Sequence, residues 1–201
     1  HLVGVVFIKS DSVKVARAQT TPAADAMRMI NVHLAGRFIE HQTIVGALAL
    51  AAAARAGTAE RTSRTLARLR LFGRLLLYPA VFLLTAGIFT GAVWANASWG
   101  RYWGWDPKEV WALITLIVYA LPLHEQSLAR FRRPLFFHAY TLWAFAAVLM
   151  TYFGVNYLLG GMHSYGGGFR PGYAAATVFA AVTAFALLTV AALIRQRRTD
   201  A

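Results

Sequence analysis

Hydrophobic residues occur in long runs along the chain, and shorter polar segments separate these runs. About 20 apolar residues in a helix cross a lipid bilayer. Backbone groups in lipid must be satisfied within one segment, and the runs are too long to be strands of a membrane barrel. The pattern therefore predicts an all-α, polytopic transmembrane bundle of about five spans, at residues 32–54, 75–95, 107–124, 135–159 and 173–194.

The segments between the runs are polar or basic. Residues 9–31 mix charged, small and polar residues around Pro22, which predicts a solvated external loop. Residues 55–74 are basic, and the stretch LARLRLFGRL within them has the pattern of an amphipathic helix. The opening HLVGVVFI is typical of the end of an interrupted hydrophobic run, so we expect an N-terminally truncated chain. The expected organisation is a hydrophobic stump with an external loop (1–31), a transmembrane domain (32–195) and a cytoplasmic tail (196–201).

The composition agrees with a membrane protein, and the charges give its orientation. Of the 201 residues, 58% are hydrophobic and 14% are charged, with a mean hydropathy of +0.51, which is too apolar for an ordinary soluble domain. The net charge is +12, but many basic residues lie in connections that alternating spans place on one side of the membrane. Cytoplasmic connections carry such an excess, so we expect a cytoplasmic C-terminus and no nucleic-acid partner. These residues are Arg55, Arg61, Arg64, Arg68, Arg70, Arg74, Arg130, Arg132, Arg133, Arg195, Arg197 and Arg198.

The first run carries polar residues in its first half, namely Arg37, Glu40, His41 and Gln42. Charges within a bilayer are costly unless they face protein or water. Helical spacing places Arg37 on one face with Glu40 or His41. Two interpretations stay open, a helix end in the membrane interface or a functional site.

A tryptophan-rich polar segment, WGRYWGWDPKEVW, begins at Trp99 between the second and third runs. An aromatic belt at the lipid headgroups explains one or two tryptophans, but not four together with charged residues. Helical spacing would place Trp99 and Trp103 on one face, and Gly100 and Gly104 would let backbones approach closely. Asp106 is expected to fix the segment by accepting backbone N–H bonds. Such a surface suits a large, flat, apolar ligand with a polar rim.

The stretch WGRYWGWDPKEVWALI resembles the signature of the WWD haem-handling family of cytochrome c biogenesis. The family pattern W-G-x-x-W-x-W-D is met, and the Pro-Lys-Glu that follows is similar to the CcsA/ResC branch, the membrane subunit of the system II cytochrome c synthase. The stretch YFGVNYLLGGMHSYG at residues 152–166 is similar to the same branch, so the resemblance covers about residues 30–170. The haem-binding residues that it implies are Trp99, Gly100, Trp103, Trp105, Asp106 and Trp111.

The histidines supply candidate ligands, because neutral imidazole is a common axial ligand of haem iron. In the expected topology, His33 and His163 lie on the outer side together with the tryptophan segment. The resemblance implies that these two hold the iron of haem b, although the family usually has Ser where this chain has Ala35. It also implies a second haem iron at His124, near the cytoplasmic side. His138 lies at a similar depth and is a local alternative ligand.

The resemblance implies a function in cytochrome c maturation. Haem is expected to be presented on the outer face for thioether attachment to the Cys-x-x-Cys-His motif of apocytochrome c, with movement of haem across the membrane as a further activity. The chain has no cysteine, so the thiols must belong to the apocytochrome. The implied setting is a holocytochrome c synthase complex with a CcsB/ResB-type membrane subunit, in a bacterial cytoplasmic membrane with the tryptophan segment on the periplasmic side.

Three alternatives stay open. The first is a haem carrier or exporter without synthase activity, similar to CcmC. The second is a b-type electron-transfer subunit that holds haem between His124 and His138. The third is a structural membrane subunit whose tryptophans form an interfacial belt. Candidate partners of haem propionates are Arg101, Lys108 and Arg170, and solvation at the surface is the favoured explanation for any one of them.

Overall fold

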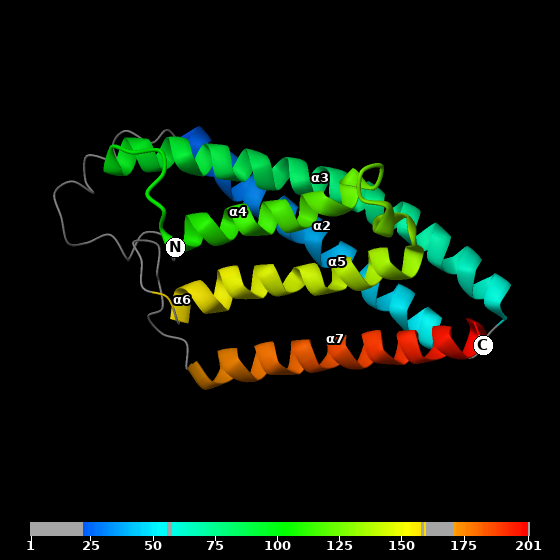
Figure 1. Ribbon diagram of the computed structural model, residues 1–201. Helices are drawn as coiled ribbons and strands as arrows, with labels where there is room; N and C mark the ends of the chain where they lie inside the picture. The colour runs from blue at the N-terminus through cyan, green and yellow to red at the C-terminus, as the bar shows by residue number, and fades with distance from the viewer. Residues whose placement is uncertain (1–21, 56–57, 158, 160–170, 201) are drawn as a thin grey trace.

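The structure is a computed structural model that describes residues 22–55, 58–157, 159 and 171–200. Within this part of the chain every regular element is a helix, so the all-α prediction is confirmed (Figure 1). The α-helices are α2 (Pro22–Ala54), α3 (Ala59–Trp99), α4 (Pro107–Ala120), α5 (Pro134–Leu149), α6 (Val155–Tyr157) and α7 (Pro171–Asp200). The shorter elements are the 3-10 helices η1 (Leu121–His124) and η2 (Ala129–Arg132), and the π-helix η3 (Met150–Gly154).

Three helices in the described residues are long and apolar enough to cross a membrane, at Glu60–Trp99, Pro134–Tyr157 and Ala175–Arg198. They correspond to the second, fourth and fifth expected spans. The expected third span is helical too, but α4 has only 14 residues and continues into η1. The expected first span lies in α2, whose polar residues after Arg37 lower its hydropathy.

Helix α3 combines two segments that the sequence pattern separates. The basic residues 59–74 and the second span form one helix of 41 residues, about 60 Å long at 1.5 Å per residue. It begins at the N-cap Thr58, whose side chain accepts a bond from the backbone N–H of Arg61 at 3.4 Å. Its exposed apolar side chains extend from Leu71 to Val93, about 33 Å, which matches the roughly 30 Å hydrocarbon core of a bilayer. The basic residues and the apolar stretch thus belong to one continuous helix, and not to an amphipathic helix followed by a separate span.

Helix α2 also begins earlier than expected. Its first residue is Pro22, so the prediction of a loop for 9–31 is wrong from Pro22 onward. Proline fits the first helical turn because its missing N–H has no partner there in any case. Residues 9–21 lie outside the described residues.

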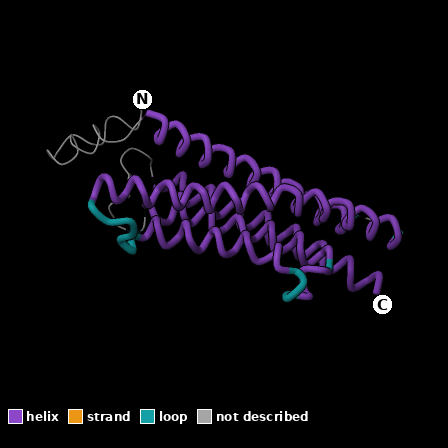
Figure 2. Tube along the Cα trace, turned by 90° about the horizontal axis from the view of Figure 1, so that it is seen from above, coloured by secondary structure: helices purple, strands orange, loops and turns teal. Residues whose placement is uncertain are grey.

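The helices lie side by side in an elongated bundle (Figures 1 and 2). One end holds the end of α3, the beginning of α4 and the beginning of α7, together with α6. The opposite end holds the end of α2, the connection from α4 to α5 and the end of α7. The basic connections therefore gather at the end opposite the tryptophan segment, as the charge pattern predicts.

Two buried clusters hold the helices together around α2. The first joins α2, α3, α4 and α5 and contains Ile39, Leu77, Ala80, Tyr119, Phe131, Phe137 and Ala144. The second joins α2, α3, α5 and α7 and contains Ala49, Leu50, Ala53, Leu66, Leu142 and Ala192. A Cβ at Gly73 would lie 3.0 Å from the Phe137 ring and 3.1 Å from the Gln42 amide, so glycine permits this close contact.

Candidate functional site

The tryptophan segment is fixed by two carboxylates that bind backbone N–H groups. Asp106 is the N-cap of α4, and its Oδ1 accepts a bond from the N–H of Lys108 at 3.0 Å. Glu109 Oε2 accepts bonds from the N–H of Gly104 at 2.7 Å and of Asp106 at 3.2 Å. This reciprocal arrangement is a capping box, so the predicted role of Asp106 is confirmed.

The tryptophans do not form a single helical face. Helix α3 ends at Trp99 because Gly100 takes the left-handed conformation, with φ of 72°. Trp99 packs edge-on against Trp94 with ring centroids 5.0 Å apart, whereas Trp103 packs edge-on against Trp105 at 6.0 Å. The prediction that Trp99 and Trp103 share a helical face is therefore wrong.

Gly100 and Gly104 do not serve to let two backbones approach closely, in contrast to the prediction. A Cβ on Gly100 would meet nothing within 4 Å, so its role is to end the helix with a positive φ. A Cβ on Gly104 would lie 3.1 Å from Nε of the Arg101 side chain, not against another backbone. Trp105 also has a positive φ, at 55°, and its side chain is 74% exposed. A non-glycine residue in this region is strained, so the segment holds an exposed indole at some conformational cost.

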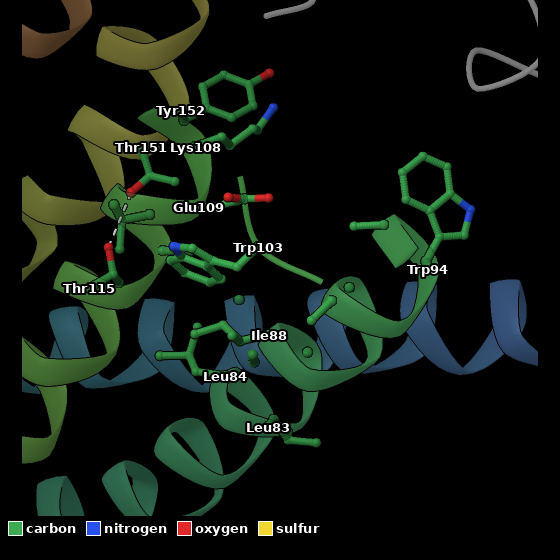
Figure 3. Close-up of a pocket in the computed structure, with 18 of the residues that line it drawn as sticks. Leu83, Leu84, Ile88, Trp94, Trp103, Lys108, Glu109, Thr115, Thr151 and Tyr152 are labelled. Atoms are coloured by element: carbon green, nitrogen blue, oxygen red, sulfur yellow. Dashed lines mark hydrogen bonds between the residues drawn. The ribbon is translucent and has the colours of Figure 1, made fainter. Parts of the chain in front are cut away.

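An apolar groove of about 400 Å³ lies beneath the segment, between α2, α3, α4 and η3. Trp103 lies beside α3 near Leu84 and Ile88, and Lys108, Glu109 and Tyr152 lie at the polar side of the groove (Figure 3). The groove is also lined by Ala35, Gly36, Gly87, Gly91, Thr115 and Thr151. This size is within the usual range for small-molecule sites, and the apolar, aromatic wall with a few polar groups suits a flat apolar ligand.

Glycine keeps the groove wide. A Cβ on Gly36, Gly87 or Gly91 would meet nothing within 4 Å. These glycines therefore are not required by helix packing, in contrast to Gly73. Their open space belongs to the groove.

A π-turn forms another wall of the groove. In η3 the side chain of Thr151 donates to the Ala147 carbonyl at 2.8 Å and lies 3.1 Å from the Thr115 hydroxyl on α4. A Cβ on Gly154 would overlap the sulfur of Met150. Single π-turns in helices are frequent at functional sites, and this one displays Thr151 and Tyr152 toward the groove.

A family model for the cytochrome C assembly protein matches residues 29–163. The chain belongs to this family. CcsA of Gloeobacter violaceus is 45% identical over 117 residues, which are 57% of this chain and 34% of the relative. CcsA of Guillardia theta is 51% identical over 86 residues (42% and 28%), and NrfI of Wolinella succinogenes is 52% identical over 86 residues (43% and 10%). The chain thus spans from a tenth to about a third of the length of these relatives.

These relatives confirm the resemblance to the CcsA type. The chain is thus a CcsA-type member of the cytochrome c assembly family, and its long apolar helices are those of an integral membrane protein. The match includes the tryptophan segment and the π-turn, whereas α7 lies beyond its end.

Of the two histidines predicted to hold haem on the outer side, the structure describes only His33. The side chain of His33 is exposed on α2, two residues before Ala35 of the groove. His163 and Arg170 lie outside the described residues. The predicted convergence of His33, His163 and the tryptophans therefore stays a prediction.

At the opposite end, His124 and His138 have different surroundings. His124 is exposed at the end of η1, and its Nδ1 lies 3.0 Å from the Ala120 carbonyl. A carbonyl only accepts, so Nδ1 carries the hydrogen and Nε2 retains a lone pair. His138 is fully buried, with Nε2 3.2 Å from the Leu66 carbonyl. Of these two histidines, only His124 therefore combines exposure with a free coordinating nitrogen.

The polar residues of the expected first span differ in their exposure to solvent. Arg37, Glu40 and His41 are exposed, and Nδ1 of His41 donates to the Arg37 carbonyl at 2.7 Å. Gln42 is fully buried among α2, α3 and α5. The choice between an interfacial end and a functional site stays open for this face.

Sequence reasoning missed three parts of the site. The capping role of Glu109 was predictable, because Asp-x-x-Glu before an apolar run is the capping-box pattern. The π-turn and the open space at Gly87 and Gly91 have no local signal, since they depend on how neighbouring helices pack.

Proposed function

We propose that the chain binds haem b beneath the tryptophan segment and presents it for thioether attachment to the Cys-x-x-Cys-His motif of apocytochrome c. The observation that carries this proposal is the apolar groove with Trp103 in its wall and a polar rim at one side. Haem is a flat apolar ring with carboxylates along one edge, so this distribution of apolar and polar groups fits it. The tryptophan-segment residues Trp99, Gly100, Trp103, Trp105, Asp106 and Trp111 form or support this surface.

The protein's own part is to bind and to orient its substrate. Haem supplies the vinyl groups, and the apocytochrome supplies the thiols. His33 and His163 are proposed as the axial ligands on the outer face. The histidine of the incoming motif replaces one of them, which brings the thiols close to the ring and makes the reaction effectively intramolecular.

The polar rim has a proposed role toward the propionates. Lys108 Nζ donates to Oδ1 of Asn156 at 3.1 Å, which ties the beginning of α4 to α6 beside the groove. A lysine held at this rim provides a positive charge for a carboxylate. Arg101 lies in the same segment and is a second candidate, as is Arg170.

His124 is proposed as a ligand for haem arriving from the cytoplasmic side. A backbone carbonyl on one imidazole nitrogen orients the ring and leaves the other nitrogen for a metal, as in many metal sites. In this proposal haem moves from His124 to the outer site. The setting includes a CcsB/ResB-type subunit and a bacterial cytoplasmic membrane, with the tryptophan segment on the periplasmic side.

The test is the reduced absorption spectrum of the purified protein in detergent. Replacing His163 with glycine should lower the haem content, and added imidazole should restore it. His33→Gly should behave in the same way, whereas His41→Gly is the matched control on the same face of α2. If His33→Ala and His163→Ala both leave haem content and cytochrome maturation unchanged, the proposed ligation is wrong.

A haem exporter similar to CcmC uses a comparable outer site. The curated relatives include several CcsA proteins, which are named for cytochrome c biogenesis, and the synthase is therefore our first candidate. Formation of covalent holocytochrome when only this system is supplied supports the synthase, and its absence supports the exporter. The b-type alternative needs open space at both His124 and His138, and the full burial of His138 argues against it.

A further inference from the structure

The connection after α4 is fastened to α3 by an ion-pair cluster. The carboxylate of Glu125 accepts bonds from Arg70 and, at 2.7 Å, from Nη1 of Arg74. Arg132 donates to the backbone carbonyls of Glu125 at 3.2 Å and of Gln126 at 3.0 Å. Three guanidinium groups therefore gather around one acidic residue.

This cluster holds more positive charge than Glu125 neutralises. The side chains of Arg70 and Arg74 are only 21% and 28% exposed. Their Nε atoms are buried and, within the described part of the chain, have no hydrogen-bond partner. Partly buried charge and unpaired donors are costly, so an additional anion would stabilise the cluster.

The cluster lies next to a proposed iron ligand. His124 directly precedes Glu125, and the Nδ1 bond to Ala120 leaves its Nε2 for coordination. The carboxylates of haem lie along one edge of the ring, so a haem with its iron on His124 can direct that edge to this connection. Guanidinium groups are the preferred partners of carboxylates, because they can donate two parallel N–H bonds.

We propose that Arg70, Arg74 and Arg132 bind the propionate carboxylates of haem at His124. This inference rests on the proposed haem site at His124 and adds the groups that recognise the charged edge of the ligand. Glu125 holds the arginines in place and is the internal competitor for them.

The test uses haem and its dimethyl ester, in which the carboxylates are neutral. Both are titrated into the detergent-purified protein carrying His163→Gly, so that the outer site contributes little. Arg74→Gln and Arg132→Gln should each weaken haem binding by roughly three- to tenfold and leave binding of the ester unchanged. Glu125→Gln should bind haem as tightly as the parent or more tightly, since it frees the arginines. Arg68→Gln, an exposed arginine on the same helix, is the matched control.

Three results would overturn the inference. Equal losses for haem and ester show that the arginines only fasten the connection. A Glu125→Gln variant that weakens haem binding as the arginine variants do leads to the same conclusion. Loss of either partner of the ion pair would then weaken binding by loosening the connection. If His124→Gly changes neither titration, the haem site at His124 itself is wrong, and the inference falls with that part of the proposed function.

Discussion

The two ends of the bundle hold their connections by different interactions. At the tryptophan end, the carboxylates of Asp106 and Glu109 bind backbone N–H groups of their own segment. At the basic end, Glu125 binds arginine side chains from α3. Backbone bonds fix the path of a segment, whereas side-chain ion pairs fix its position against another helix. The first end is therefore suited to present a shaped apolar surface, and the second to hold charge.

Added salt should weaken the interactions at the basic end more than those at the tryptophan end. Partly exposed ion pairs are screened as ionic strength rises, whereas N–H bonds to a local carboxylate within one segment depend mainly on geometry. Each end can therefore be perturbed separately, and variants at one end should leave the other unchanged.

Filling the groove should have the largest effect. Gly91→Leu places a side chain in open space, so the helix is retained while the volume for haem is lost. We expect haem retained at the tryptophan end to fall at least about tenfold, which corresponds to roughly 1.4 kcal/mol of binding free energy. The measurement is haem absorbance per protein in the purified variant.

The control for this variant is Ala67→Leu, an exposed position on the same helix and outside the groove. It should retain haem fully. Titration of haem at the His124 end should not change in either variant. Full haem content in Gly91→Leu would mean that the groove is not the haem site.

The π-turn should give the next largest effect. Gly154→Ala places its Cβ where the sulfur of Met150 lies, so the flexible thioether must move. We expect a cost at the lower end of the roughly 1–3 kcal/mol typical of overpacking. Adding Met150→Ala removes the clash, so the double variant should be more stable than the sum of the single effects indicates. Thermal unfolding of the four proteins in detergent measures this coupling. Simple additivity would contradict the proposed contact.

Loss of the capping box should cost less and act locally. Glu109→Ala removes the acceptor of the Gly104 and Asp106 N–H groups, for which we expect a loss of about 1 kcal/mol. Hydrogen exchange should speed up at these two amides and stay unchanged around Glu125. Glu109→Gln retains an acceptor oxygen and should lie between the alanine variant and the parent. Faster exchange at both ends would show that the ends are coupled.

The sequence predicts the architecture well where each element has a local cause. Apolar runs predict the helices, and Pro107 after Asp106 predicts where α4 begins. The continuity of α3 through its basic segment was not predictable from hydropathy, because good helix formers such as Arg and Leu extend a helix whether or not lipid surrounds it. The early start of α2 at Pro22 was missed for the same reason.

The site was predictable in its residues but not in its geometry. The motif gives Trp99 and Trp103, yet the left-handed Gly100 ends α3 between them, so Trp99 lies in the helix and Trp103 in the connection to α4. Whether a glycine ends a helix, opens a groove or permits close packing depends on its surroundings, as Gly100, Gly91 and Gly73 show. Local sequence does not contain that information.

The smallest expected effect compares two glycines of α3. Gly87→Ala adds a methyl group in open space within a helix, so it should stabilise the protein by about 0.5–1 kcal/mol. Gly100→Ala places alanine in the left-handed region and should destabilise by about 1 kcal/mol. Opposite shifts in the thermal midpoint, measured in detergent, would show that glycine has different conformational roles in the helix interior and at its cap. Shifts of the same sign would mean that the positive φ of Gly100 does not govern how the tryptophan segment begins, and the contrast between the two ends would lose its conformational basis.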